Sequence, residues 1–63
     1  MIHKLSMSGA GGSVTWILDD ETLVLERITS STGKREPVTA CEFDVESSVY
    51  ATAGWSTTVE HLA

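Results

Sequence analysis

The stretch Thr39–Val59, TACEFDVESSVYATAGWSTTV, decides the fold because apolar and polar side chains alternate along it. Its odd-numbered positions hold nearly all of its large apolar residues, and the even-numbered positions between them are mostly acidic, hydroxylated or small. Period-two alternation is typical of a β-strand, whereas a helix repeats its apolar face every three to four residues. The pattern predicts extended chain that turns at residues 46–48. The pairs expected across that turn are Val45 with Val49, Phe43 with Ala51, and Cys41 with Ala53.

A short helix near residues 45–53 is the alternative. Asp44 could cap its start, Gly54 could end it, and Val45 and Val49 would lie one turn apart. The composition of the segment disfavours this alternative, since it contains many indifferent or poor helix formers. These are Val45, Ser47, Ser48, Val49 and Thr52.

Residues 13–20, SVTWILDD, and 21–29, ETLVLERIT, are predicted as two further strands joined by a polar turn at 19–22. Pairing Leu18 with Leu23 gathers most of the large apolar residues on one face, which is the expected core face. That face holds Val14, Trp16, Leu18, Leu23 and Leu25. The reverse face is also partly apolar, which is not typical of a sheet with one face exposed to solvent. Another part of the same chain could cover it by closing a barrel, or a second copy could, and we assign its residues Ile17, Val24 and Ile28 to self-association.

The predicted fold class is therefore all-β, a single domain over residues 1–63. We expect a small antiparallel meander of five to six strands, as a curled sheet or open barrel, with α+β containing a short helix near 45–53 as the alternative. Residues 2–7 are expected to form an edge strand, and Gly54 to mark a bend before a last strand over 55–62. A core of this size rarely supplies more than about 3 to 5 kcal/mol. We therefore expect a homo-oligomer, with a dimer favoured.

The sequence contains no motif that predicts catalysis, a cofactor or a metal. In STGK, residues 31–34, Ile28 stands where a phosphate-binding loop needs its first glycine and Arg35 where it needs Ser or Thr. Cys41 stands at one of the odd-numbered, mostly apolar positions of this stretch and is predicted to be a buried thiol. His3 and His61 stand at opposite ends of the chain, without the spacing of a zinc motif. We expect a protein that is not an enzyme, with no catalytic residue, no cofactor and no metal site.

Nine acidic and four basic residues give a formal net charge of −5. This balance opposes direct binding to nucleic acid, which needs clustered Lys and Arg, and permits a basic protein partner. Apolar runs are too short for a signal peptide or a bilayer-spanning helix. The expected location is the cytoplasm, without membrane association.

Three carboxylates, Glu42, Asp44 and Glu46, would follow one another along one strand face at spacings of about 6.6 Å. Two steps of a DNA strand span a similar distance, at about 3.4 Å each. The row could thus occupy the nucleic-acid site of a basic protein, although a solvated, solubilising face is the simpler interpretation. Tyr50 stands at one of the even-numbered, mostly polar positions, and tyrosine is an amphipathic residue that is enriched at protein interfaces.

These patterns favour a small acidic protein-interaction module or structural subunit that self-associates and binds another macromolecule. The alternative is an acidic inhibitor that occupies the nucleic-acid-binding site of a basic protein. In both hypotheses the partner-binding residues are Glu42, Asp44, Glu46 and Tyr50. Trp16 and Trp55 are predicted to be core anchors rather than binding residues.

Overall fold

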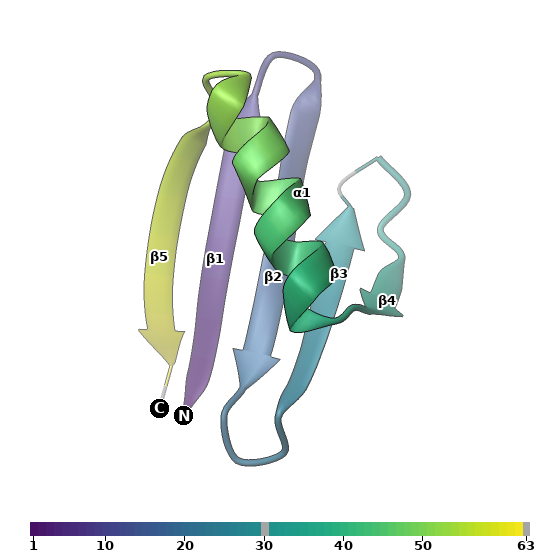
Figure 1. Cartoon of the computed structure of the whole chain (residues 1–63), viewed down its shortest axis with the longest axis vertical. Coiled ribbons are helices and arrows are strands. Elements are labelled where there is room, and N and C mark those ends of the chain that lie inside the picture. Colours follow the sequence, from purple (N-terminus) through teal and green to yellow (C-terminus); the bar gives the residue numbers. More distant parts are fainter. Residues whose placement is uncertain (30, 63) are drawn as a thin grey trace.

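The computed structural model describes residues 1–29 and 31–62, and consists of one antiparallel sheet and one helix (Figure 1). The elements in chain order are β1 (Ile2–Gly9), β2 (Gly12–Asp19), β3 (Val24–Thr29), β4 (Arg35–Pro37), α1 (Ala40–Thr52) and β5 (Ser56–Leu62). The strand order across the sheet is β4-β3-β2-β1-β5, and every neighbouring pair is antiparallel. The antiparallel meander is confirmed, together with the helix of the stated alternative.

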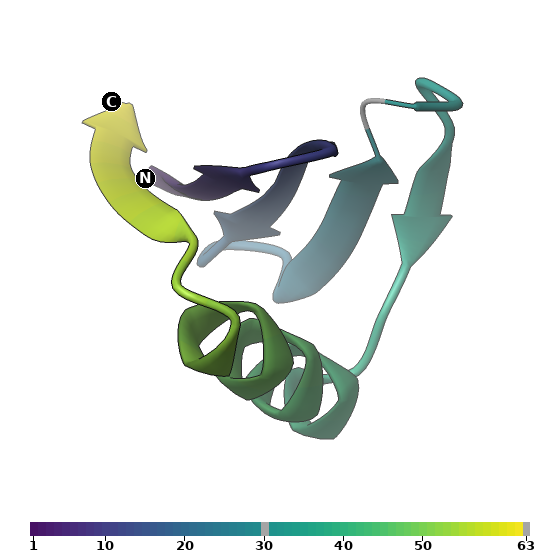
Figure 2. The same cartoon turned by 90° about the horizontal axis from the view of Figure 1, so that it is seen from above.

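The molecule has two layers, because α1 lies across one face of the sheet (Figure 2). We call this the helix-side face and the opposite one the open face. None of the elements in the described chain covers the open face. The predicted position of residues 2–7 at a sheet edge is wrong. β5 pairs with β1 from Ile2↔Leu62 to Ser8↔Ser56, so β5 and the three-residue β4 form the edges.

Residues 40–52 are helical, so the prediction of extended chain here, with its three cross-strand pairs, is wrong. A capping box starts the helix: Thr39 Oγ1 accepts from the Glu42 N–H at 3.1 Å, and Glu42 Oε1 accepts from the Thr39 N–H at 3.3 Å. The cap is thus Thr39, five residues before Asp44. Gly54 ends the helix as the alternative expected, with a φ of 85° that suits glycine.

Packing against the sheet stabilises this helix despite its weak intrinsic propensity. Met7, Val14 and Trp16 form the buried core, which confirms Trp16 as an anchor. Phe43 meets the Trp16 ring edge to face with centroids 5.2 Å apart, and Tyr50 lies 5.9 Å from it. Phe43 and Tyr50 are seven residues apart, two helical turns, and so share the face that contacts the core.

Cys41 is exposed, so its predicted burial is wrong. The prediction depended on strand parity, under which Cys41 and Phe43 share a face. On a helix, two residues separated by two positions are rotated by about 200°, since each residue turns the chain by about 100°. Phe43 therefore faces the sheet while Cys41 faces solvent.

The register between β2 and β3 is shifted by two residues from the expected one. Leu18 pairs with Leu25 and Trp16 with Arg27, because the turn extends through Leu23. A shift of two keeps every side chain on its face. The face assignments therefore hold for all but Leu23: Val14, Trp16 and Leu18 lie on the helix side with Leu25. Ile17, Val24 and Ile28 lie together on the open face.

Candidate interaction site

An apolar groove lies on the helix-side face, where α1 crosses the sheet obliquely and leaves one end of β1, β2 and β3 uncovered (Figure 1). Its volume is about 590 Å³, within the range typical of ligand and side-chain binding clefts. Strands and helix contribute apolar side chains to its walls, among them Leu5, Leu18, Leu23, Leu25, Phe43 and Val59. His3, Lys4 and Thr39 are the polar or charged residues that line it. Such a surface gains free energy when another apolar surface covers it.

Leu23 stands at the edge of this groove with 78% of its surface exposed. Its φ is 60°, in the left-handed region that favours glycine or asparagine and costs other residues about 1–2 kcal/mol. The conformation closes the turn, since the Leu23 N–H donates to the Asp19 carbonyl at 2.8 Å. A strained backbone thus holds a large apolar side chain out in solvent, beside an apolar groove.

The two chain ends meet in a polar cluster beside the groove. His3 Nδ1 lies 2.8 Å from His61 Nδ1, and His3 Nε2 lies 3.0 Å from Asp20 Oδ2. The N-terminal amine donates to Asp20 Oδ1 at 2.7 Å. This hydrogen bond, followed by the one from His3, holds the pKa of Asp20 below its usual range. The sequence patterns gave no support to a histidine pair, because nothing in them fixes how β1 and β5 align.

A hydrogen bond joins the rings of His3 and His61 through their Nδ1 atoms. His3 Nε2 donates to Asp20, so one Nδ1 must hold the proton and the other must accept it. Within residues 1–29 and 31–62, no group of three or more His, Cys, Asp and Glu side chains is placed to hold a metal ion.

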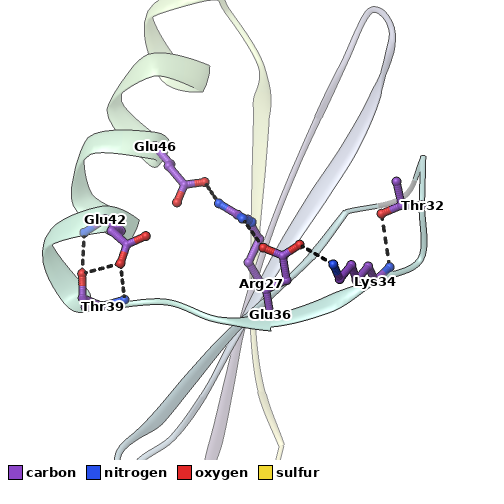
Figure 3. Close-up of polar contacts among 7 residues, drawn as sticks. All are labelled: Arg27, Thr32, Lys34, Glu36, Thr39, Glu42 and Glu46. Carbon is purple, nitrogen blue, oxygen red and sulfur yellow. Dashed lines mark hydrogen bonds and ion pairs between the residues drawn. The ribbon is translucent and has the colours of Figure 1, made fainter.

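The three acidic residues predicted to form a straight row do not form one, because they lie on α1. Glu42 belongs to the capping box, and Glu46 binds Arg27 on β3, which also binds Glu36 at 2.9 Å (Figure 3). The pKa of Arg27 is raised, first by its hydrogen bond to Glu46. Asp44 is exposed on a different side of the helix, about 200° from its two neighbours in the expected row.

Tyr50 lies in the aromatic packing rather than on a polar strand face. Its ring is 4.6 Å from the Trp55 ring, in addition to its contact with Trp16. Trp55 is half-buried and covers Gly9, where an added Cβ would lie 2.6 Å from Trp55 Cδ1. Both aromatic residues therefore fix the end of α1 to the strands, which gives Tyr50 a structural role.

The open face carries the three apolar residues expected to mediate self-association. Val24 is 46% exposed, and Ile17 and Ile28 are half-buried. Polar side chains lie between them: Ile17 is flanked in the sheet by Lys4 on β1 and Glu26 on β3, and Glu26 forms an ion pair with Arg35 at 3.3 Å. The open face thus mixes apolar and polar side chains, and no element of the described chain covers it.

Comparison with protein-family models, with curated proteins and with solved structures finds no match for this chain. No helix among the described residues is long and apolar enough to cross a bilayer. The groove, the open face and the charged residues near them are therefore the features of this chain that bear on its function.

Proposed function

We propose that this protein is an interaction module that self-associates and binds another macromolecule, and that its role is binding rather than catalysis. The observation that carries the proposal is the apolar groove of about 590 Å³ beside α1, with Leu23 exposed at its edge. The groove receives apolar side chains of a protein partner. Covering it would remove apolar surface from water, at about 25 cal/mol for each Å².

The open face is the proposed surface for self-association. Ile17, Val24 and Ile28 lie on the neighbouring strands β2 and β3, on the face that no element of the described chain covers, so the same face of a second copy could cover them. Only three residues of the described chain form the buried core, so the monomer has little apolar burial to stabilise it. A dimer would add burial to a small core.

The alternative of an acidic inhibitor receives less support. It required Glu42, Asp44 and Glu46 in a straight row, whereas Glu42 caps α1 and Glu46 is engaged by Arg27. A charged surface can still select a basic partner, but no observation favours imitation of a nucleic-acid strand.

Sedimentation at low micromolar concentration tests self-association. We expect the wild type to sediment as a species larger than the 6.8 kDa monomer, and the variant Ile17→Thr/Ile28→Thr to sediment as a monomer. The control Val45→Thr/Val49→Thr removes two apolar residues from the outer side of α1, where they are 59% and 61% exposed. The control should retain the oligomer. A monomeric wild type would contradict the self-association.

Capture from native lysate tests partner binding by the groove. Immobilised wild type should retain proteins that the variant Leu23→Asn/Val59→Thr loses, because both substitutions replace exposed apolar groove residues. The control Val45→Thr/Val49→Thr should capture the same proteins as the wild type. Identical capture by all three proteins would contradict a binding role for the groove.

A further inference from the structure

His3 and His61 form a pair of imidazole rings that the sheet holds together. The two residues stand directly opposite each other in the register of β1 and β5, so their side chains leave the sheet on the same face. His3 Nδ1 lies 2.8 Å from His61 Nδ1, and the ring centroids are 4.9 Å apart. The two residues are 58 positions apart in the chain, so the folded state is needed to bring these nitrogens together.

Asp20 fixes the orientation of the His3 ring. Its Oδ2 accepts from His3 Nε2 at 3.0 Å, which leaves Nδ1 as the nitrogen that faces His61. A carboxylate on the far nitrogen is typical of histidines that bind metal ions. It sets the tautomer and the ring orientation, and it makes the nitrogen that binds the ion more basic. Asp20 and His3 therefore have the arrangement of a carboxylate–histidine pair at a metal site.

The distance between the two Nδ1 atoms also suits a shared metal ion. Transition metals bind imidazole nitrogen at about 2.0–2.1 Å, so two such nitrogens lie about 2.8–3.4 Å apart for bond angles between about 90° and the tetrahedral angle. The observed 2.8 Å is at the short end of this range. Each ring must turn until its lone pair points to the ion rather than to the other ring. His61 is exposed, so a proton that leaves its Nδ1 can return through water to its Nε2.

We propose that His3 and His61 bind one divalent transition-metal ion through their two Nδ1 atoms, with Asp20 as a positioning residue behind His3. Imidazole suits Zn²⁺, Ni²⁺ and Cu²⁺, whereas Mg²⁺ and Ca²⁺ take oxygen ligands. Asp20 is engaged by His3 and by the N-terminal amine, so the site has two protein ligands and water fills its other positions. This site goes beyond the binding role proposed above and does not depend on it.

Isothermal titration calorimetry of the untagged protein with ZnCl₂ tests the site. We expect one Zn²⁺ to bind per chain, and MgCl₂ to bind at least about tenfold more weakly. His3→Asn and His61→Asn should each weaken Zn²⁺ binding by at least about tenfold, because each removes one of the two ligands. The control Cys41→Ser removes the exposed thiol, a ligand that zinc could use instead, and should retain the wild-type affinity.

Two variants of Asp20 test its positioning role. Asp20→Asn should weaken Zn²⁺ binding by about tenfold, since the carboxylate behind His3 is lost. Asp20→Glu retains a carboxylate and should recover part of the affinity. Equal affinity of the two variants would contradict a role for the carboxylate in orienting His3.

Stability and NMR give measurements that do not require the histidine variants to fold. Because the two ligands meet in the folded state, free Zn²⁺ at ten times its dissociation constant should raise the ratio of folded to unfolded wild type by about tenfold in urea. The ring signals of both histidines should shift with the same saturation as ZnCl₂ is added. A stability that does not respond to Zn²⁺, or a shift of one ring alone, would overturn the proposal.

The variants can overturn the proposal in two further ways. Unchanged affinity in His61→Asn would mean that residues 1–3 bind the ion by themselves. A loss in Cys41→Ser as large as that in the histidine variants would make the thiol the ligand. The function proposed above is tested separately, by the dependence of capture on Leu23 and Val59, so either proposal can fail without the other.

Discussion

Replacing Leu23 by Asn should stabilise the folded monomer, although it removes a leucine. Leu23 adopts a φ of 60°, a conformation that costs a residue of its type about 1–2 kcal/mol and that Asn adopts more readily. Its side chain is 78% exposed, so only about a fifth of the usual 1.5–3 kcal/mol for a buried leucine is lost, or roughly 0.3–0.7 kcal/mol. The relief of strain exceeds this loss. We expect the free energy of unfolding to rise by about 0.5–1.5 kcal/mol.

Urea unfolding followed by tryptophan fluorescence measures this change. For a chain of this size the free energy falls by about 1 kcal/mol for each molar of urea, so the midpoint should rise by roughly 0.5–1.5 M. The titration must be made at a protein concentration at which sedimentation shows a monomer, because association would add its own stabilisation.

Leu23→Ala separates the two contributions. Alanine removes the same apolar surface as asparagine but retains the cost of the left-handed backbone. It should therefore be no more stable than the wild type, and less stable than Leu23→Asn. A lower midpoint for Leu23→Asn than for the wild type would refute the reasoning, because it would mean that the exposed leucine stabilises the monomer. In that case the positive φ of Leu23 would give no reason to assign its side chain a role in binding.

Three further substitutions test the rest of the fold. Gly9→Ala should destabilise the protein by about 1–3 kcal/mol in urea, because its Cβ would lie 2.6 Å from the Trp55 ring and must displace it. Thr39→Ala should cost about 1 kcal/mol and reduce the helical circular dichroism signal, since it removes the N-cap. The pKa of Asp20 is lowered by the N-terminal amine and by His3, so its contribution to stability is present above the unfolded pKa and is lost as pH falls through the folded one. Asp20→Asn should therefore lower the urea midpoint at pH 7, and the difference from wild type should shrink below about pH 4; a difference that grows in acid would contradict this sign.

The strands of the sheet could be predicted from the sequence because their patterns are local. Residues 13–20 and 21–29 alternate with period two, and the alternation alone assigned Ile17 and Trp16 to opposite faces. The register was off by two residues, since polarity does not show that Leu23 belongs to the turn. A leucine with positive φ is uncommon enough that no sequence rule would place it there.

The helix was missed as the main prediction because residues 41–50 satisfy two periods at once. Cys41, Val45 and Val49 are spaced by four and face solvent, while Phe43 and Tyr50 are spaced by seven and face the sheet. Apolar residues on both sides of a helix cancel its amphipathic signal and imitate strand alternation. One available signal was the sequence TACE at 39–42, which matches the Ser/Thr-x-x-Glu capping box.

The groove could not be predicted from the sequence, because it results from how far α1 extends over the sheet. Its lining residues come from four strands, from two of the loops between elements and from the helix, and no local pattern links them. The acidic residues illustrate the same limit. Their number permitted a basic partner, but only the fold shows that Glu46 is bound by Arg27 and that Glu42 belongs to the capping box.

The incomplete cover of the sheet connects the stability of this protein with its proposed role. A 13-residue helix cannot extend over the full length of eight-residue strands that it crosses obliquely, so part of the apolar helix-side face stays exposed. A longer helix would fill the groove and bury Leu25 and Val59, which would stabilise the monomer. It would also remove the surface on which a partner could bind. The strained, exposed Leu23 indicates the same balance between stability of the monomer and binding of a partner. A glycine or asparagine at this position would suit the turn better but would not present an apolar side chain.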